Sequence, residues 1–164
     1  MLTARRGLAT AIDYSLLAVP LGLLAAGALL RQRRRPGSAL PDVSPAKVRV
    51  LVAVGLTMPL SAALAVTEAA GGSPGKRALG LTLRDETSAG SPSYPQALVR
   101  SLLKTAVPWE LGHQAVWEFR ADNTRRGAVL AAGSYLALGL QAAAIVRNRR
   151  TYPERASQTR VTSK

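Results

Sequence analysis

Three long runs without charged side chains organise this chain. The first covers residues 14–30 and extends back to residue 8, interrupted by Asp13, and the others cover 50–67 and 127–146. Because an α-helix rises about 1.5 Å per residue, about 20 residues cross a hydrocarbon core of about 30 Å. The pattern predicts an all-α, polytopic transmembrane fold with spanning helices at about 8–30, 48–67 and 127–146.

Basic residues mark the ends of these runs. Four arginines follow the first run, before a Pro- and Gly-containing loop at 36–46, and further arginines flank the third run: Arg125, Arg126, Arg147, Arg149 and Arg150. The chain is 48% hydrophobic yet carries a net charge of +13. Basic residues at span ends are typical of anchoring to anionic headgroups, so we expect the lipid bilayer, and not nucleic acid, to be the partner of this charge.

Two other classes of protein share parts of this pattern. A soluble helical bundle would have to cover helices that are apolar all round, and a chain this short has too few amphipathic helices to do so. A cleaved targeting signal would fit Arg5-Arg6 and the small residues at 26–28. Asp13 within the apolar stretch, the arginines after it and the two later runs argue against cleavage.

The segment between the second and third runs has a different pattern. Alternating leucines at 79–83 form a weak strand-like pattern, and 97–107 has helical spacing with Arg100 and Lys104 opposite its apolar stripe. We expect those two cations to reach lipid phosphates, Pro108 to end the helix, and the region of about 95–119 to be interfacial or re-entrant.

An aromatic stripe follows, in which Trp109, His113 and Trp117 are each four residues apart. If the segment is helical, these side chains share one face. The pattern is typical of an interfacial aromatic belt, and the alternative is that His113 handles protons near Glu110 and Glu118.

The chemistry of most enzyme and metal sites is missing from the sequence. The chain has no cysteine and a single histidine, so we expect no metal and no cofactor. Gly75-Lys76 does not continue into a phosphate-binding loop, because Ala70 and Arg77 stand where that motif needs Gly and Ser or Thr. With no nucleophile–base set either, we expect no enzymatic activity.

Asp13 is the most informative residue, since a carboxylate inside a span usually faces a partner or a water-filled cavity. Arg6, Ala9 and Asp13 share one helix face, with Arg6 and Asp13 about 10 Å apart along the axis. We expect Arg6 and Asp13 to form an intramembrane charge pair. Its role is either to fix helix packing or to serve an ion or proton pathway.

Four stretches in this chain resemble the RDD family of small bacterial membrane proteins. They are Arg6-x-x-Ala9-x-x-Ile12-Asp13, the segment from Ser73 through Gly75-Lys76-Arg77 to Gly80, the basic helix around Arg100, and the closing segment 149–161. The family's name comes from one Arg and two Asp, which map to Arg6, Asp13 and Glu154. Here Glu154 and Pro153 replace the family's usual closing pattern, in which an Asp precedes the Arg.

The resemblance implies a single membrane domain over 1–164 with a basic tail at 147–164, located in the bacterial cytoplasmic membrane as a multi-pass protein. It implies transport of ions or small solutes, with the transported species left open. The alternative is a non-transporting membrane scaffold or accessory subunit. Small residues in the first and third runs favour self-association into a homo-oligomer. Orientation, and three against four crossings, stay open.

Overall fold

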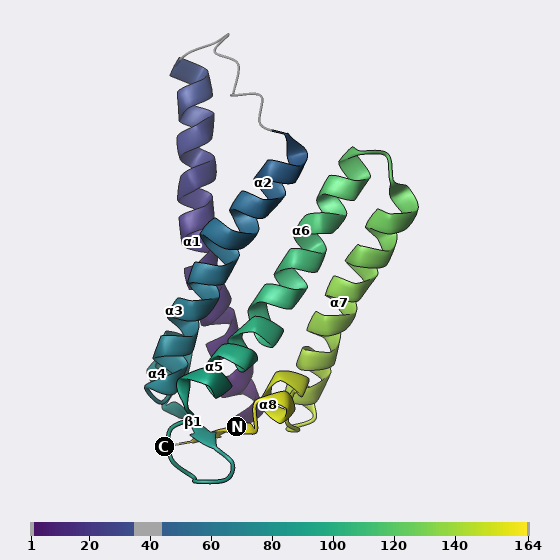
Figure 1. The fold of residues 1–164 in the computed structure, drawn as a ribbon. Coiled ribbons are helices and arrows are strands. Elements are labelled where there is room, and N and C mark those ends of the chain that lie inside the picture. The colour runs from purple at the N-terminus through teal and green to yellow at the C-terminus, as the bar shows by residue number, and fades with distance from the viewer. Residues whose placement is uncertain (1, 35–43, 164) are drawn as a thin grey trace.

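The computed structural model describes residues 2–34 and 44–163, apart from side chains in the first helix at 17, 18, 20, 21, 24, 25, 28, 29 and 32. The loop expected at 36–46 therefore falls largely outside the described residues. The chain is mostly helical, at 76%. The helices run up and down in an antiparallel bundle (Figure 1).

Within the described residues, the bundle consists of four long helical passes. The first is α1 (Leu2–Arg34) and the last is α7 (Thr124–Val146). The second combines α2 (Pro45–Val52), a π-helical turn η1 (Ala53–Thr57) and α3 (Met58–Ala69). The third combines α5 (Tyr94–Ser101), a π-helical turn η2 (Leu102–Ala106) and α6 (Val107–Arg120). All three uncharged runs thus lie in helices.

The third pass differs from the expectation for this region. Pro108 does not end the helix, which continues from α5 through η2 into α6 and runs beside α7. The structure explains how prolines are accommodated, because η1 lies just before Pro59 and η2 just before Pro108. A π-helical turn widens the helix where the proline ring would otherwise meet the preceding turn.

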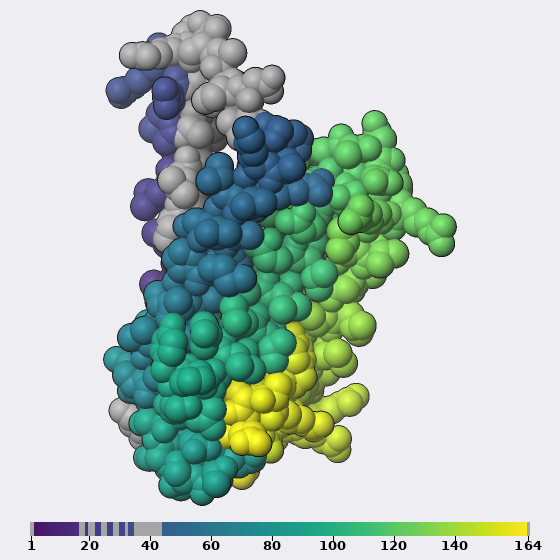
Figure 2. All heavy atoms as spheres, in the orientation of Figure 1, coloured from purple at the N-terminus to yellow at the C-terminus, as the bar shows by residue number. Residues whose placement is uncertain are grey.

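Both chain ends lie at the same end of the bundle, which we call the terminal end (Figure 1). There α4 (Pro74–Ala78) leads into β1 (Leu81–Asp85), and α8 (Tyr152–Ala156) leads into β2 (Thr159–Ser163). The strands pair antiparallel, with Leu83 opposite Val161. The strand-like pattern at 79–83 is thereby confirmed, whereas no pattern along the chain predicted β2. Leu81, Leu83 and Val161 pack on Ala9 of α1. The C-terminal segment lies beside α5 and α7 at the terminal end (Figure 2).

The outer faces of the helices are apolar. Leu23 is 69% exposed, Val54 64% and Tyr135 75%, while the interior holds many charged side chains. Two described helical stretches, Pro45–Ala78 and Thr124–Val146, are long and apolar enough to cross a membrane. Large apolar side chains turned outward on several helices are what a lipid environment favours.

The terminal end depends on a close approach between α1 and α4. A Cβ added at Gly75 would overlap the Ala9 carbonyl oxygen and lie 2.9 Å from the Asp13 carboxylate. Only the missing side chain lets the α4 backbone touch α1. The glycine in the family-like segment is therefore a packing requirement.

We predict that Gly75→Ala lowers the free energy of unfolding by at least about 2 kcal/mol, because the added methyl has no room to relax. Reversible unfolding in mixed micelles measures this. Gly7→Ala in α1 is the matched control, since no atom lies within 4 Å of its added Cβ. Equal stability of the two variants would contradict the packing argument.

Candidate functional site

Asp13 is buried near the start of α1 and binds groups from two other segments. Its Oδ2 accepts a hydrogen bond from Ser73 Oγ at 2.6 Å, and its Oδ1 accepts one from Gly75 N at 2.9 Å. Lys104 Nζ lies 3.2 Å from Oδ2, and Lys76 Nζ lies 3.9 Å from it. One carboxylate therefore ties α1 to α4 and to η2.

Glu68, near the end of α3, forms a second centre. Its Oε1 accepts from Lys76 Nζ at 2.6 Å and from Arg100 Nη1 of α5. Lys76 also donates to Ser73 Oγ at 3.0 Å, which links this centre to Asp13. Glu68 is only 2% exposed, so its charge depends on these cations for compensation.

Glu154 forms a third centre at the start of α8. Its Oε2 accepts from Arg6 Nη2 at 2.7 Å and from Thr151 N at 2.7 Å. Thr151 and Glu154 also make a capping box, in which each side chain binds the other's backbone N–H. The capping box fixes the carboxylate in position for Arg6.

These side chains make one buried assembly, which we call the charge cluster: Arg6, Asp13, Glu68, Lys76, Arg100, Lys104 and Glu154. Two expectations from the sequence are corrected here. Arg6 pairs with Glu154 and not with Asp13, since α8 folds back beside α1. Arg100 and Lys104 are 4% and 7% exposed; they face carboxylates inside the bundle and do not reach out to lipid phosphates.

The rest of the family-like segment has structural roles. Arg77 donates to the carbonyl oxygens of Gly72 and Thr67, at 2.8 and 3.1 Å, and so completes the end of α3. Gly80 has a φ of +61° in the turn into β1, which favours glycine. Together with Ser73, Gly75 and Lys76, these residues fold the chain sharply between α3 and β1.

Pro108 also contributes to the site through the hydrogen bond it cannot make. Proline has no N–H, so Pro108 offers no donor to the carbonyl oxygens of Lys104 and Leu103, which lie four and five residues before it and would accept that donor in an α- or a π-helical turn. Tyr152 Oη donates to Leu103 O at 2.8 Å, and Tyr14 Oη donates to Lys104 O at 2.9 Å. Gln141 of α7 adds a bond to Lys104 O. The freed carbonyls thereby bind α1, α7 and α8 to the third pass.

A large apolar cavity lies between the helices beyond the charge cluster. Its volume is about 570 Å³, within the usual range for ligand cavities. Tyr14 and Thr105, each next in sequence to a cluster residue, line one part of it. Helices α1, α3, α6 and α7 all contribute to its walls: Tyr14, Leu56, Thr57, Leu60, Ser61, Thr105, Pro108, Trp109, Gly112, His113, Val116, Ser134 and Leu138.

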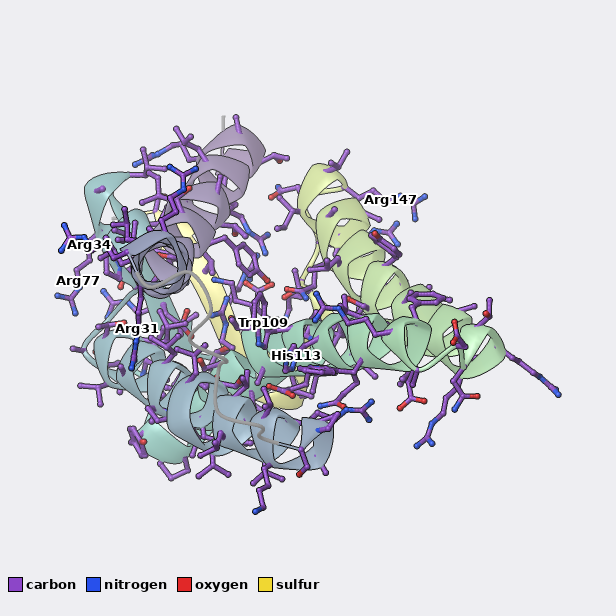
Figure 3. The ribbon with its side chains drawn as sticks, turned by 90° about the horizontal axis from the view of Figure 1, so that it is seen from above. Arg31, Arg34, Arg77, Trp109, His113 and Arg147 are labelled. Atoms are coloured by element: carbon purple, nitrogen blue, oxygen red, sulfur yellow. The ribbon has the colours of Figure 1, made fainter. Side chains whose placement is uncertain are left out.

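His113 faces this cavity with a polar partner on each side. Trp117 Nε1 donates to His113 Nε2 at 3.0 Å, which leaves the proton of a neutral imidazole on Nδ1. That Nδ1 lies 3.9 Å from Glu110 Oε2, and Thr57 Oγ1 donates to Glu110 Oε1. Seen from above, Trp109 and His113 lie near the middle of the bundle, whereas Arg147 points outward from α7 (Figure 3).

The aromatic stripe is confirmed, with the Trp109 and His113 rings stacked at 6.2 Å between centroids. Glu118 belongs to another group, because it pairs with Arg49 at 2.8 Å at the loop end of the bundle, opposite the terminal end. His113 is thus brought together with Glu110 and not with Glu118. Within residues 2–34 and 44–163, no group of three His, Asp or Glu side chains could hold a metal ion.

Several cluster residues had no clear signal in the sequence. Glu68 marked only the boundary of an apolar run, and Lys104 had the pattern of an amphipathic helix. Thr151-x-x-Glu154 is a capping-box signature that could have identified α8. The pairing of Arg6 with Glu154 spans 148 residues, and no local pattern reveals it.

The environment of Glu154 determines its protonation. Burial of the carboxyl group raises its pKa, but the Arg100 and Arg6 guanidiniums and the Thr151 hydrogen bonds outweigh burial. The pKa of Glu154 therefore lies below its ordinary value of 4.5. A carboxylate with a lowered pKa in the folded state stabilises the fold above its unfolded pKa, and this contribution is lost as pH falls through the folded pKa.

Comparison with known proteins gives one clear relationship. The model of the RDD family matches residues 2–156, nearly the whole chain. No curated protein and no solved structure matches the chain.

We predict that Glu154→Gln lowers the free energy of unfolding by about 3 kcal/mol at pH 7, because Arg6 keeps a buried charge without its carboxylate. The difference from wild type should shrink as pH falls below about 4.5, where the unfolded chain gains a proton on Glu154, and it should continue to shrink until pH falls through the lower pKa of the folded carboxylate. Unfolding in mixed micelles from pH 7 to pH 3 measures both effects.

The matched control is Glu86→Gln. Glu86 pairs with Arg150 at 2.6 Å but is 39% exposed, so its loss should cost less than about 1 kcal/mol. If the difference in free energy of unfolding between wild type and Glu154→Gln is the same at pH 3 as at pH 7, the ion pair between Arg6 and ionised Glu154 does not stabilise the fold.

Proposed function

The chain belongs to the RDD family, and from this premise we propose that it transports ions or small solutes across the bacterial cytoplasmic membrane. It does so without catalysing a reaction. The family and the apolar helices indicate a membrane protein. The proposal of transport depends on how polar groups are distributed along the bundle.

The observation that carries the proposal is a series of ionisable groups, buried in the charge cluster and half-buried at Glu110 and His113, at successive positions along the third pass. The charge cluster lies at the terminal end, His113 lines the apolar cavity with Glu110 beside it, and Glu118 pairs with Arg49 near the loop end. Ionisable groups inside a membrane bundle are costly, and they commonly mark substrate or proton pathways. The large apolar cavity provides space for a solute between the charge cluster and His113.

The arrangement of the passes favours four membrane crossings over three. The third pass runs beside α7 (Figure 1), and the Arg6–Glu154 pair holds the first helix next to the segment after the last. An even number of crossings places both termini on one side of the membrane. Three spans with an interfacial helix would instead place them on opposite sides.

A second candidate function is a membrane scaffold or accessory subunit. It is favoured by α1, which packs mainly against α4 and α7 near the terminal end. Farther from that end, α1 exposes Leu16, Val19 and Leu23. A neighbouring helix, from a second copy or another protein, would cover this face. Self-association would serve either function.

The Glu110→Gln variant tests transport. We predict that purified wild-type protein in liposomes dissipates a pH gradient in the presence of Na⁺, K⁺ or Li⁺, and that Glu110→Gln slows this at least about tenfold. The reason is that glutamine cannot exchange a proton with His113 or bind a cation by charge. A pH-sensitive dye inside the vesicles reports the rate.

The control is again Glu86→Gln, which should keep the wild-type rate because Glu86 lies outside the series. Asp13→Asn is less informative alone, since Asp13 also holds α4 against α1. Equal insertion and folding of all variants must be verified first. Absence of flux from well-folded wild-type protein would favour the scaffold, and unchanged flux in Glu110→Gln would remove Glu110 from the pathway.

A further inference from the structure

The charge cluster does not balance its own charge. Among the described side chains it contains four cations and three carboxylates, because Glu68 alone serves both Lys76 and Arg100. Asp13 faces Lys104 and Lys76, and Glu154 faces Arg6. All these groups are at most 8% exposed, so bulk water does not screen the excess positive charge.

A small cavity lies within the charge cluster. It is lined by all four cations of the cluster but by a single carboxylate, Glu154, together with the Gln141 amide. Glu68 and Asp13 are not among the lining residues. The lining therefore carries a net positive charge, and an anion placed in the cavity would face mostly hydrogen-bond donors.

An unsatisfied donor supports the same conclusion. Arg100 Nε is buried and has no hydrogen-bond partner within the described part of the chain. The Arg100 residue is 4% exposed and lines the cavity. A buried donor of a charged group is costly to leave unbonded, and an anion or a water molecule would satisfy it.

The cavity size restricts what enters. Its volume of about 20 Å³ exceeds the roughly 10–15 Å³ needed for one water molecule. A monatomic anion is near this size, whereas a phosphate or a larger carboxylate needs more room. Leu81 of β1 and Val161 of β2 also line the cavity, so the paired strands close it on one side.

We propose that this cavity binds one small inorganic anion of about the size of chloride, which balances the charge cluster. The anion is held between Arg6, Arg100 and the two lysines. Binding makes the stability of the terminal end depend on halide concentration. The site requires no transport, so it stands apart from the function proposed above.

Chloride binding is tested on detergent-purified protein free of added lipid. The midpoint of thermal unfolding is measured with sodium chloride or bromide rising from 1 to 100 mM, with gluconate keeping the ionic strength constant. For a site with a Kd of about 10 mM, the midpoint should rise by about 3 °C. Broadening of the ³⁵Cl NMR signal, reversed by bromide, gives a second and direct measure in wild-type protein.

Lys104→Met removes one cation, keeps a stem of similar length and leaves equal numbers of cations and carboxylates. We expect it to lose the halide-dependent shift and the broadening. Arg5→Gln is the matched control, because Arg5 donates to Leu79 O and does not line the cavity, so it should keep both signals.

The outcomes separate the alternatives. A wild-type midpoint equal in chloride and gluconate, without ³⁵Cl broadening, would overturn the proposal whether or not the variants fold. A shift with phosphate but not with chloride would also overturn it and would indicate a headgroup-like ligand. Halide binding without any liposome flux would support the anion site and contradict transport. Flux without halide binding would support transport and contradict the anion site.

Discussion

The structure depends above all on the burial of charge at the terminal end of a bundle whose outer faces are apolar. Asp13 is the central residue, because its two oxygens bind α4 and η2 while its backbone belongs to α1. Buried charges are tolerated only where partners and hydrogen bonds replace water. The sharp turn at Ser73–Gly75, the return of α8 to Arg6 and the position of the third pass all serve to supply those partners.

Two prolines determine how the helices meet this cluster. Each lies just after a π-helical turn, so the helix continues across the bundle instead of ending. At Pro108 the freed carbonyl oxygens then become acceptors for Tyr14, Tyr152 and Gln141. A residue that normally weakens a helix here gives the third pass its contacts with three other segments.

The sequence allowed the apolar helices to be located, because their signal is local and long, and the family-like segments indicated most of the residues that matter. The surroundings of Arg100 and Lys104 were misjudged for a physical reason. Arg100 and Lys104 give the same pattern whether they face lipid headgroups or buried carboxylates, and the difference lies in Glu68 and Asp13, which are 32 and 91 residues away. Strand β2 and the Arg6–Glu154 pair depend likewise on contacts between the two ends of the chain.

Glu154 fits this geometry closely. The carboxylate must reach both the Thr151 backbone and Arg6, with donor distances of 2.7 Å to each. Glutamate three residues after a threonine forms a capping box, so one side chain serves the helix start and the ion pair together. This side chain thus keeps the charge where Arg6 and Arg100 need it.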